Sequence, residues 1–316
     1  MKRRSFLALP VIAIHSAFAL SDELRCRVCG KVLTNLDRYY QVQAGKEVIC
    51  ERCYEEAPRC SVCKLPTAPD DIDPDIGACS KCLAKLPHCL ACGKAILGPA
   101  YRFSTSTGVF CAACKRDRPA CDLCGVPVGD TYWKYPDGRV ICNECGRRAV
   151  FDVRAVESIM RDVQKTAERR LGLKIREPYR LKVEQLSSLI ASDTKPEDRA
   201  AREEAALYKG ELGLFRRKEG KSEIILLFGL PPDLLYETAA HEYAHAWTAE
   251  NGLSDLEPEL LEGFAQWVAA DVLREKGFKG ALENLEARTD SPYGTGYQRL
   301  KAMQQNYIMD LLQKKR

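Results

Sequence analysis

Two histidines and a glutamate in one pentapeptide are the residues with the clearest chemical potential: His241-Glu242-Tyr243-Ala244-His245. Residues four apart on a helix lie about 40° apart around its axis, so His241 and His245 can hold one metal ion from the same helical face. Glu242 then stands beside that ion, where it can take a proton from a water molecule. Because this spacing is the zinc metallopeptidase arrangement, the sequence predicts a hydrolytic zinc centre.

A third metal ligand is expected from the next helix along the chain, which Pro258 opens. Glu262 lies seventeen residues after His245, and this placement suits zinc sites that complete two histidines with a glutamate. Glu257 and Glu259 are the competitors, but they fall in the exposed first turn, where acidic residues simply suit the helix dipole. Glu262 is therefore the predicted third ligand.

Two further residues are candidates for supporting roles at this centre. Gln266, one turn beyond Glu262, can orient a metal ligand. Tyr293 is a candidate donor to the oxyanion that forms on the substrate, since no spare histidine lies nearby. The alternative for Tyr293 is a scaffolding role in the turn beside Gly294.

The sixteen cysteines form a second kind of candidate site. All of them lie in residues 26–145, and each belongs to a Cys-x-x-Cys pair. Taken two pairs at a time, the pairs are separated by 20, 15, 18 and 17 residues, which is the spacing that places four thiolates around one zinc ion. A disulfide framework is the alternative, but disulfide scaffolds rarely show two-residue spacing in every pair. We predict four structural zinc sites, each with four cysteine ligands: Cys26, Cys29, Cys50 and Cys53; Cys60, Cys63, Cys79 and Cys82; Cys89, Cys92, Cys111 and Cys114; Cys121, Cys124, Cys142 and Cys145.

The cysteine modules repeat one unit, because six residues separate each module from the next. Glycine follows the second cysteine in three modules, at Gly30, Gly93 and Gly125, and can supply the left-handed backbone that such turns need. The second module has Lys64 at that position, so the glycine pattern is not uniform.

The charge balance argues against a nucleic-acid partner. The chain has 48 basic and 44 acidic residues, and three of the basic ones lie at positions 2–4. Four zinc ions (+8) and sixteen thiolates (−16) add a further −8, so the metal-loaded protein is expected to be net acidic. A protein partner is the remaining candidate for the modules, whose aromatic residues, among them Tyr132, Trp133 and Tyr135, are interpreted as fillers of small interiors.

The first 19 residues have the pattern of a signal peptide. Basic residues at 2–4 precede an apolar run over 6–19 that ends in Ala17-Phe18-Ala19, a small-x-small cleavage pattern. Arg3-Arg4 resembles the twin-arginine signal, with the general secretory route as the alternative. The run is shorter than the roughly 20 residues of a spanning helix, so we expect cleavage, no stable membrane insertion, and a periplasmic or secreted bacterial protein.

The chain is predicted to be α+β, with a signal peptide (1–19), four LIM-like zinc-ribbon β-hairpin modules (20–148) and a helix-rich, zincin-like metallopeptidase domain (149–316). Residues 192–210 are interpreted as a loop with a short solvated helix. Residues 222–229 are expected to pair with an extended substrate. The other predicted elements are a helix over 153–171, a strand around 181–183, and a hairpin formed by 211–217 and 222–229.

Three separated segments together resemble the DA-one-like family, which in plants comprises organ-size regulators that pair LIM-type zinc modules with a C-terminal metallopeptidase domain. The segments are His-Glu-Tyr-Ala-His-Ala-Trp (241–247), Leu-Glu-Gly-Phe-Ala-Gln (261–266) and Ser-Pro-Tyr-Gly-Thr-Gly (291–296). The resemblance covers most of residues 175–300 and, more loosely, the cysteine-rich half. It implies that His241, His245 and Glu262 bind the catalytic zinc and that Glu242 is the base.

The cysteine modules depart from the family pattern in two respects. True LIM domains join their zinc units by two residues and commonly include a histidine ligand, whereas this chain has six-residue spacers and only cysteines. The plant enzymes also carry ubiquitin-interacting segments before the modules, whereas here Cys26 follows the predicted signal peptide almost at once, so activation by ubiquitin is not carried over.

These features predict an exported zinc endopeptidase that holds about five zinc ions, four structural and one catalytic. Its substrate is a protein or peptide, and the modules serve as a recruiting or regulatory arm. The alternative is a non-catalytic zinc-module adaptor with a degenerate peptidase domain.

Overall fold

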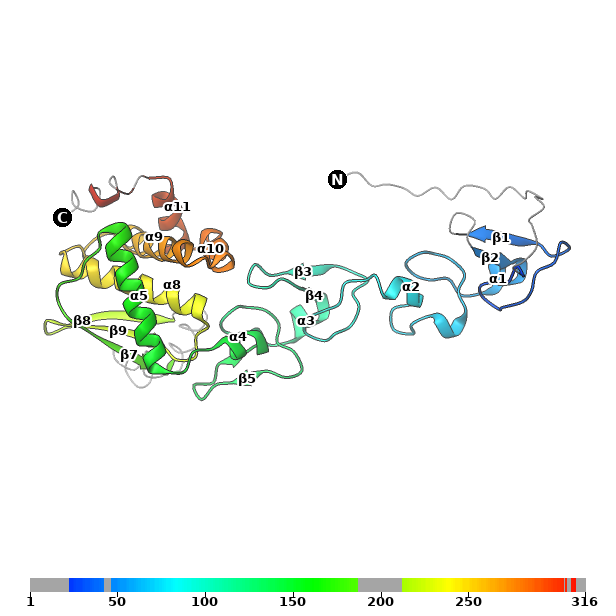
Figure 1. Ribbon diagram of the computed structural model, residues 1–316, viewed down its shortest axis with the longest axis horizontal. Coiled ribbons are helices and arrows are strands. Elements are labelled where there is room, and N and C mark those ends of the chain that lie inside the picture. The colour runs from blue at the N-terminus through cyan, green and yellow to red at the C-terminus, as the bar shows by residue number, and fades with distance from the viewer. Residues whose placement is uncertain (1–22, 43–46, 187–211, 304, 306–307, 311–316) are drawn as a thin grey trace. The chain divides into compact units, whose positions relative to one another are not determined.

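The computed structural model describes residues 23–42, 47–186, 212–303, 305 and 308–310. The chain divides into two compact units: residues 1–88 with 93–99, and residues 89–92 with 100–316. The first unit holds the first two cysteine modules, and the second holds most of the third module, the whole fourth module and the C-terminal helices and sheet (Figure 1). The division therefore falls within the third module, whereas the composition changes near residue 148.

Two regions predicted from the sequence, the signal peptide at 1–19 and the loop at 192–210, lie outside the described residues. Within the described part of the chain, no helix combines the length and the apolar character needed to cross a bilayer.

The cysteine modules share one plan, in which a Cys-x-x-Cys turn leads through a hairpin to a short helix. The first cysteine of the second pair sits at the N-cap of that helix in every module. The second module has a 3-10 turn, η1 (Pro69–Asp71), in place of a regular hairpin. The elements are β1 (Tyr39–Val42), β2 (Glu47–Cys50) and α1 (Glu51–Glu56); α2 (Ser80–Leu83); β3 (Ala100–Arg102), β4 (Val109–Cys111) and α3 (Ala112–Asp117); β5 (Trp133–Lys134), β6 (Val140–Ile141) and α4 (Asn143–Arg148).

The residue after each first Cys-x-x-Cys pair adopts a left-handed backbone in all four modules. Gly30, Gly93 and Gly125 have φ between 70° and 72°, and Lys64 has φ of 64°. A left-handed conformation costs an L-residue such as lysine roughly 1 kcal/mol. The second module adopts it nonetheless, so the four turns share their geometry although they do not share glycine.

The C-terminal region opens with α5 (Val153–Leu171), which ends at Gly172 in the left-handed conformation. Three strands follow, β7 (Tyr179–Glu184), β8 (Gly213–Lys218) and β9 (Lys221–Leu227). β8 and β9 form an antiparallel hairpin whose two turn residues, Glu219 and Gly220, have positive φ, as a primed two-residue turn requires. The helix, the strand near 181–183 and the hairpin therefore match the sequence predictions.

β9 is the central strand of this sheet, and this position corrects one prediction. β9 pairs in parallel with β7 on one side and antiparallel with β8 on the other. Both of its backbone edges are occupied, so residues 222–229 cannot add a substrate strand. Among the described residues, no strand pairs with the outer edge of β8, which makes β8 the available edge on the hairpin side.

The described residues after β9 include the helices α8 (Pro232–Glu250), α9 (Pro258–Lys276), α10 (Lys279–Glu286) and α11 (Tyr293–Lys301). α8 and α9 each begin with proline at the first position, where its missing N–H leaves no bond unmade. α8 packs against α5, α9 and the sheet, and its apolar residues are buried on several faces. The core of this region forms around α8 and α9, the two helices that carry the predicted metal ligands.

α9 and α11 approach so closely that only glycine fits at their crossing. A Cβ atom on Gly263 would lie 2.4 Å from the carbonyl carbon of Gly296, and a Cβ on Gly296 would lie 2.0 Å from the carbonyl oxygen of Glu259. These contacts are to backbone, which cannot move aside as a flexible side chain can. The glycines of the 261–266 and 291–296 segments therefore allow the backbones of the two helices to come into contact.

We predict that Gly296→Ala lowers the free energy of unfolding by about 3 kcal/mol, because the added methyl group forces α11 away from α9. Gly280→Ala is the matched control: Gly280 lies in α10 with no atom within 4 Å of its Cβ position, so alanine there is neutral or stabilising by up to about 1 kcal/mol. Denaturant unfolding of both variants measures the difference. Equal effects at the two positions would contradict the close-packing argument.

Candidate metal centre

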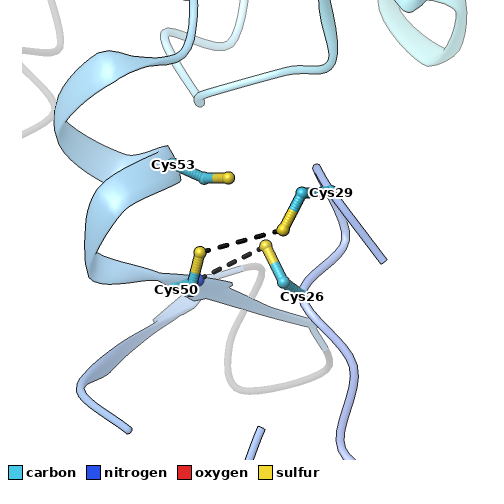
Figure 2. Close-up of side chains that lie close together, drawn as sticks. All are labelled: Cys26, Cys29, Cys50 and Cys53. Atoms are coloured by element: carbon cyan, nitrogen blue, oxygen red, sulfur yellow. Dashed lines mark hydrogen bonds between the residues drawn. The ribbon is translucent and has the colours of Figure 1, made fainter. Parts of the chain in front are cut away.

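The sixteen cysteines gather into four clusters of four, each made by consecutive Cys-x-x-Cys pairs as predicted. In every cluster the sulfur atoms lie within 4.8 Å of one another, and Figure 2 shows the four side chains of the first cluster turned toward a common space. The Sγ atoms of Cys29 and Cys50 are 3.9 Å apart, and those of Cys124 and Cys142 are 3.7 Å apart. A disulfide requires about 2.05 Å, and none of the sixteen cysteines, all of which lie in the described residues, forms one.

These separations suit a tetrahedral ion. With zinc–sulfur bonds of about 2.3 Å, the sulfurs of a tetrahedral site are about 3.8 Å apart. In every module the backbone N–H of the third cysteine donates to the sulfur of the first, which favours the thiolate form that binds metal. These bonds run from Cys50 N to Cys26 Sγ (3.4 Å), Cys79 N to Cys60 Sγ (3.2 Å), Cys111 N to Cys89 Sγ (3.3 Å) and Cys142 N to Cys121 Sγ (3.2 Å).

A fifth cluster joins α8 and α9. The Nε2 atoms of His241 and His245 are 3.0 Å apart, and the Oε2 atom of Glu262 lies 3.1 Å from the first and 3.3 Å from the second. Three ligands at zinc distances of about 2.0–2.1 Å in tetrahedral geometry are separated by about 3.3 Å. The three atoms therefore form one face of a tetrahedron of the right size for zinc.

The electrostatics of this cluster suit a cation. Burial works to raise the pKa of Glu262, but hydrogen bonds from the two imidazoles outweigh it and lower that pKa to about 2. Glu262 is therefore anionic at neutral pH, as a metal-binding carboxylate must be. The competing acids lie elsewhere: Glu257 is 2.8 Å from the Arg299 guanidinium, and Glu259 is 3.9 Å from it.

Contacts to α5 and the following loop hold the two ligand-bearing helices in place. The Tyr243 hydroxyl, between the two histidines in sequence, donates a hydrogen bond to the carbonyl of Leu173 at 2.8 Å. Arg170 forms two hydrogen bonds, of 2.6 and 2.8 Å, to the carboxylate of Asp271 on α9. Such bidentate pairs fix orientation as well as distance.

Glu242 is buried at the junction of α8 and β8, with 6% of its surface exposed. A Cβ atom on Gly213 would lie 2.9 Å from Glu242 Cγ, so the carboxylic side chain occupies the space that a side chain at 213 would need. Burial raises the pKa of Glu242, and the neighbouring His241 and His245 act in the opposite direction. A carboxylate held in this way is suited to accept a proton.

The two remaining predicted residues, Gln266 and Tyr293, line a cavity of about 1270 Å³ that His241 and Glu242 also line. Tyr293 begins α11, and its ring centroid lies 6.0 Å from that of His241. Gln266 is 4% exposed, but in the described part of the chain neither its Oε1 nor His241 Nδ1 has a hydrogen-bond partner. The expected orientation of a ligand by Gln266 is therefore not present as a direct hydrogen bond.

The sequence did not predict that the third and fourth cysteine modules line part of this cavity. Besides the metal-centre residues, the cavity is lined by Phe110 of the third module and by Leu123 and Arg147 of the fourth. No local pattern singles these residues out, because their role depends on how distant segments pack. Likewise, of the aromatic residues expected to fill the fourth module, Tyr132 and Trp133 are exposed, and only Tyr135 is buried.

One family model matches the part of the chain that contains the candidate metal ligands. Residues 198–291 match the model of the DA1-like family, described as Protein DA1, and this range contains His241, Glu242, His245 and Glu262. The chain is also similar to two proteins of Arabidopsis thaliana. Protein DA1-related 1 is 25% identical over 291 residues, and Protein DA1-related 2 is 27% identical over 192 residues.

These matches cover 81% and 51% of this chain, but only 47% and 36% of the respective plant proteins. The chain thus spans about half the length, or less, of the curated relatives it matches. No solved structure matches the chain.

We predict that metal analysis of the purified protein finds about five zinc ions per chain, one for each cluster. His245→Ala removes one of the three non-cysteine ligands and lowers the content to about four. Elemental analysis after gel filtration measures both values. A content of four in the natural protein, unchanged by His245→Ala, would show that the fifth cluster does not hold a metal.

Proposed function

We propose that the protein is a zinc-dependent endopeptidase whose metal ligands are His241, His245 and Glu262. The observation that carries this proposal is that the three ligand atoms form a triangle with sides of 3.0–3.3 Å. Glu242, the residue after His241 on the same helix, is buried beside them. Three protein ligands leave a fourth tetrahedral position for water or substrate, as catalytic rather than structural zinc sites require. The match of residues 198–291 to the DA1-like family supports the same assignment.

Zinc, when bound, supplies Lewis-acid polarisation of the scissile carbonyl and makes a water more acidic. Glu242 would accept a proton from that water and pass it to the leaving amine. Its burial beside the backbone of β8 excludes bulk water from the carboxylate and fixes its direction. His241 and His245 hold their imidazoles four residues apart on one helix, so the site is assembled before substrate binds.

The substrate is proposed to be an extended segment of protein or peptide. Leu212 and Gly213, at the start of β8, line the same cavity as His241 and Glu242. An extended peptide can add to the outer edge of β8 through backbone hydrogen bonds, which recognise a peptide without requiring a particular sequence. This edge replaces residues 222–229 as the proposed place of strand pairing.

Export is part of the proposal. The pattern of residues 1–19 supports cleavage near Leu20 and release into the periplasm or the medium. Sequencing the N-terminus of the mature protein from its host tests this directly: a mature chain that begins at Met1 would overturn it.

We predict that Glu242→Gln keeps about five zinc ions per chain but lowers the rate of peptide hydrolysis at least about 100-fold, because glutamine cannot accept a proton. Glu157→Gln, on an exposed position of α5, is the matched control and keeps full activity. Cleavage of a denatured protein, followed by mass spectrometry, provides the measurement. If neither the natural protein nor Glu242→Gln cleaves the substrate, the chain is a metal-binding adaptor and not a peptidase, and equal cleavage by both would show that Glu242 is not the base.

Tyr293 is proposed as the donor to the oxyanion, because its ring lies beside that of His241 in the cavity. Tyr293→Phe is expected to lower kcat about 100-fold with little change in KM, since the hydroxyl acts on a charge present only in the transition state. Steady-state kinetics on a fluorogenic peptide gives both constants. A lowered unfolding midpoint with unchanged kcat would instead assign Tyr293 to scaffolding the start of α11.

A further inference from the structure

We propose that the fourth cysteine module (residues 121–145) is a structural part of the C-terminal domain and positions the start of α8. Four modules of one repeated plan would be expected to act alike, as a recruiting arm. The contacts of the fourth module instead join it to the chain that leads into the metal-binding helix. This proposal concerns folding and metal retention, so it does not depend on whether the protein cleaves peptides.

A buried ion pair makes the first connection. Arg139 and Asp137, in the hairpin turn of the fourth module, have fully buried side chains joined at 2.9 Å from Nε to Oδ2. Arg139 also donates from Nη2 to the carbonyl oxygen of Phe228 at 2.9 Å, and Asp137 Oδ2 accepts the N–H of Leu186 at 3.3 Å. The pair thus binds one backbone group just beyond β7 and one just beyond β9.

This arrangement has an energetic consequence. A buried ion pair is strongly destabilising when one partner is removed, because an uncompensated charge is left in the interior. Both charges of the Asp137–Arg139 pair come from the fourth module, but two of the backbone groups that bond to them come from the segments just beyond β7 and β9. Separation of the module from the sheet would leave these charges without those partners.

Tyr135 makes the second connection. Its hydroxyl donates to the carbonyl oxygen of Gly229 at 3.2 Å, and its ring packs against those of Phe151 and Phe228, at centroid distances of 5.6 and 5.4 Å. A Cβ atom on Gly229 would lie 2.6 Å from the Tyr135 ring. Gly229 therefore permits both the left-handed backbone (φ of 70°) and the close approach of the ring.

Backbone pairing after α4 makes the third connection. Val150 N donates to the carbonyl oxygen of Leu230 at 3.0 Å, and Gly229 N donates to that of Val150 at 3.1 Å. Arg148, at the end of α4, pairs with Asp233 in the first turn of α8 at 2.7 Å. Residues 228–230 are thus held from several sides immediately before α8 begins at Pro232.

We infer that these contacts depend on a metal ion bound by the fourth cluster. Tyr135, Asp137 and Arg139 lie between Cys124 and Cys142, and the two-residue strands β5 and β6 are too short to hold such a hairpin by themselves. A module of this size needs its metal to fold. The ion held by Cys121, Cys124, Cys142 and Cys145 should therefore support the segment that starts the helix of His241 and His245.

The first test compares cysteines at equivalent positions of two modules in the full chain. Cys145→Ser and Cys53→Ser each remove the last, buried ligand of a module. The thermal midpoint is followed by the helical circular dichroism signal, which comes mainly from the 19-residue helices α5, α8 and α9. We expect Cys145→Ser to lower this midpoint by about 10 °C or more and Cys53→Ser to change it by less than about 2 °C. Equal shifts, or no shift for Cys145→Ser, would overturn the proposal.

The second test leaves every cysteine in place. Arg139→Met removes the bond to Phe228, and Arg118→Met is the matched control, because Arg118 also binds one carboxylate and one carbonyl, those of Asp130 and Val128. The readout is the rate at which a chromophoric chelator removes the zinc ion of the fifth cluster. This ion is identified as the one that the His245→Ala variant lacks. We expect Arg139→Met to accelerate this release at least about tenfold, Arg139→Lys to restore part of the loss, and Arg118→Met to have less than about a twofold effect. An unchanged release rate in Arg139→Met would refute the connection.

Discussion

The packing of α8 against α9 is the contact on which the candidate metal centre depends. Two imidazoles from one helix and one carboxylate from the other converge to 3.0–3.3 Å, which is close for polar groups unless a cation or shared protons lie between them. The close glycine crossing of α9 with α11 and the Arg170–Asp271 pair restrain α9 from two further directions. The candidate metal site therefore depends on how the helices pack and not on one motif alone.

Interactions within a short stretch of chain could be predicted from the sequence. The four cysteine clusters, the helix that ends at Gly172 and the hairpin around Glu219 and Gly220 all follow from spacing and from residue preferences that act over a few residues. Glu262 was a longer inference, but it needed only the assumption that two consecutive helices pack together. The structure brings it to the two histidines.

Features that depend on strand order or on distant partners could not be predicted in this way. An apolar strand such as β9 has the same sequence pattern at the centre of a sheet as at its edge, so its pairing with β7 could not be predicted. Arg139 and its acceptor at Phe228 are 89 residues apart, and an Asp-Gly-Arg turn looks like an ordinary solvated loop. Their burial arises only when the module and the sheet meet.

Because residue 213 is glycine, β8 can also support the side chain of Glu242. Because the Glu242 side chain rests against this strand, the position of the backbone at 213 limits how far the carboxylate can withdraw from the histidines. Under the proposed function, a peptide docked along β8 would contact the same backbone that Glu242, the proposed base, rests against. If the proposed function holds, β8 would both bind the substrate and restrain the Glu242 side chain, so substrate binding would limit the movement of the proposed base.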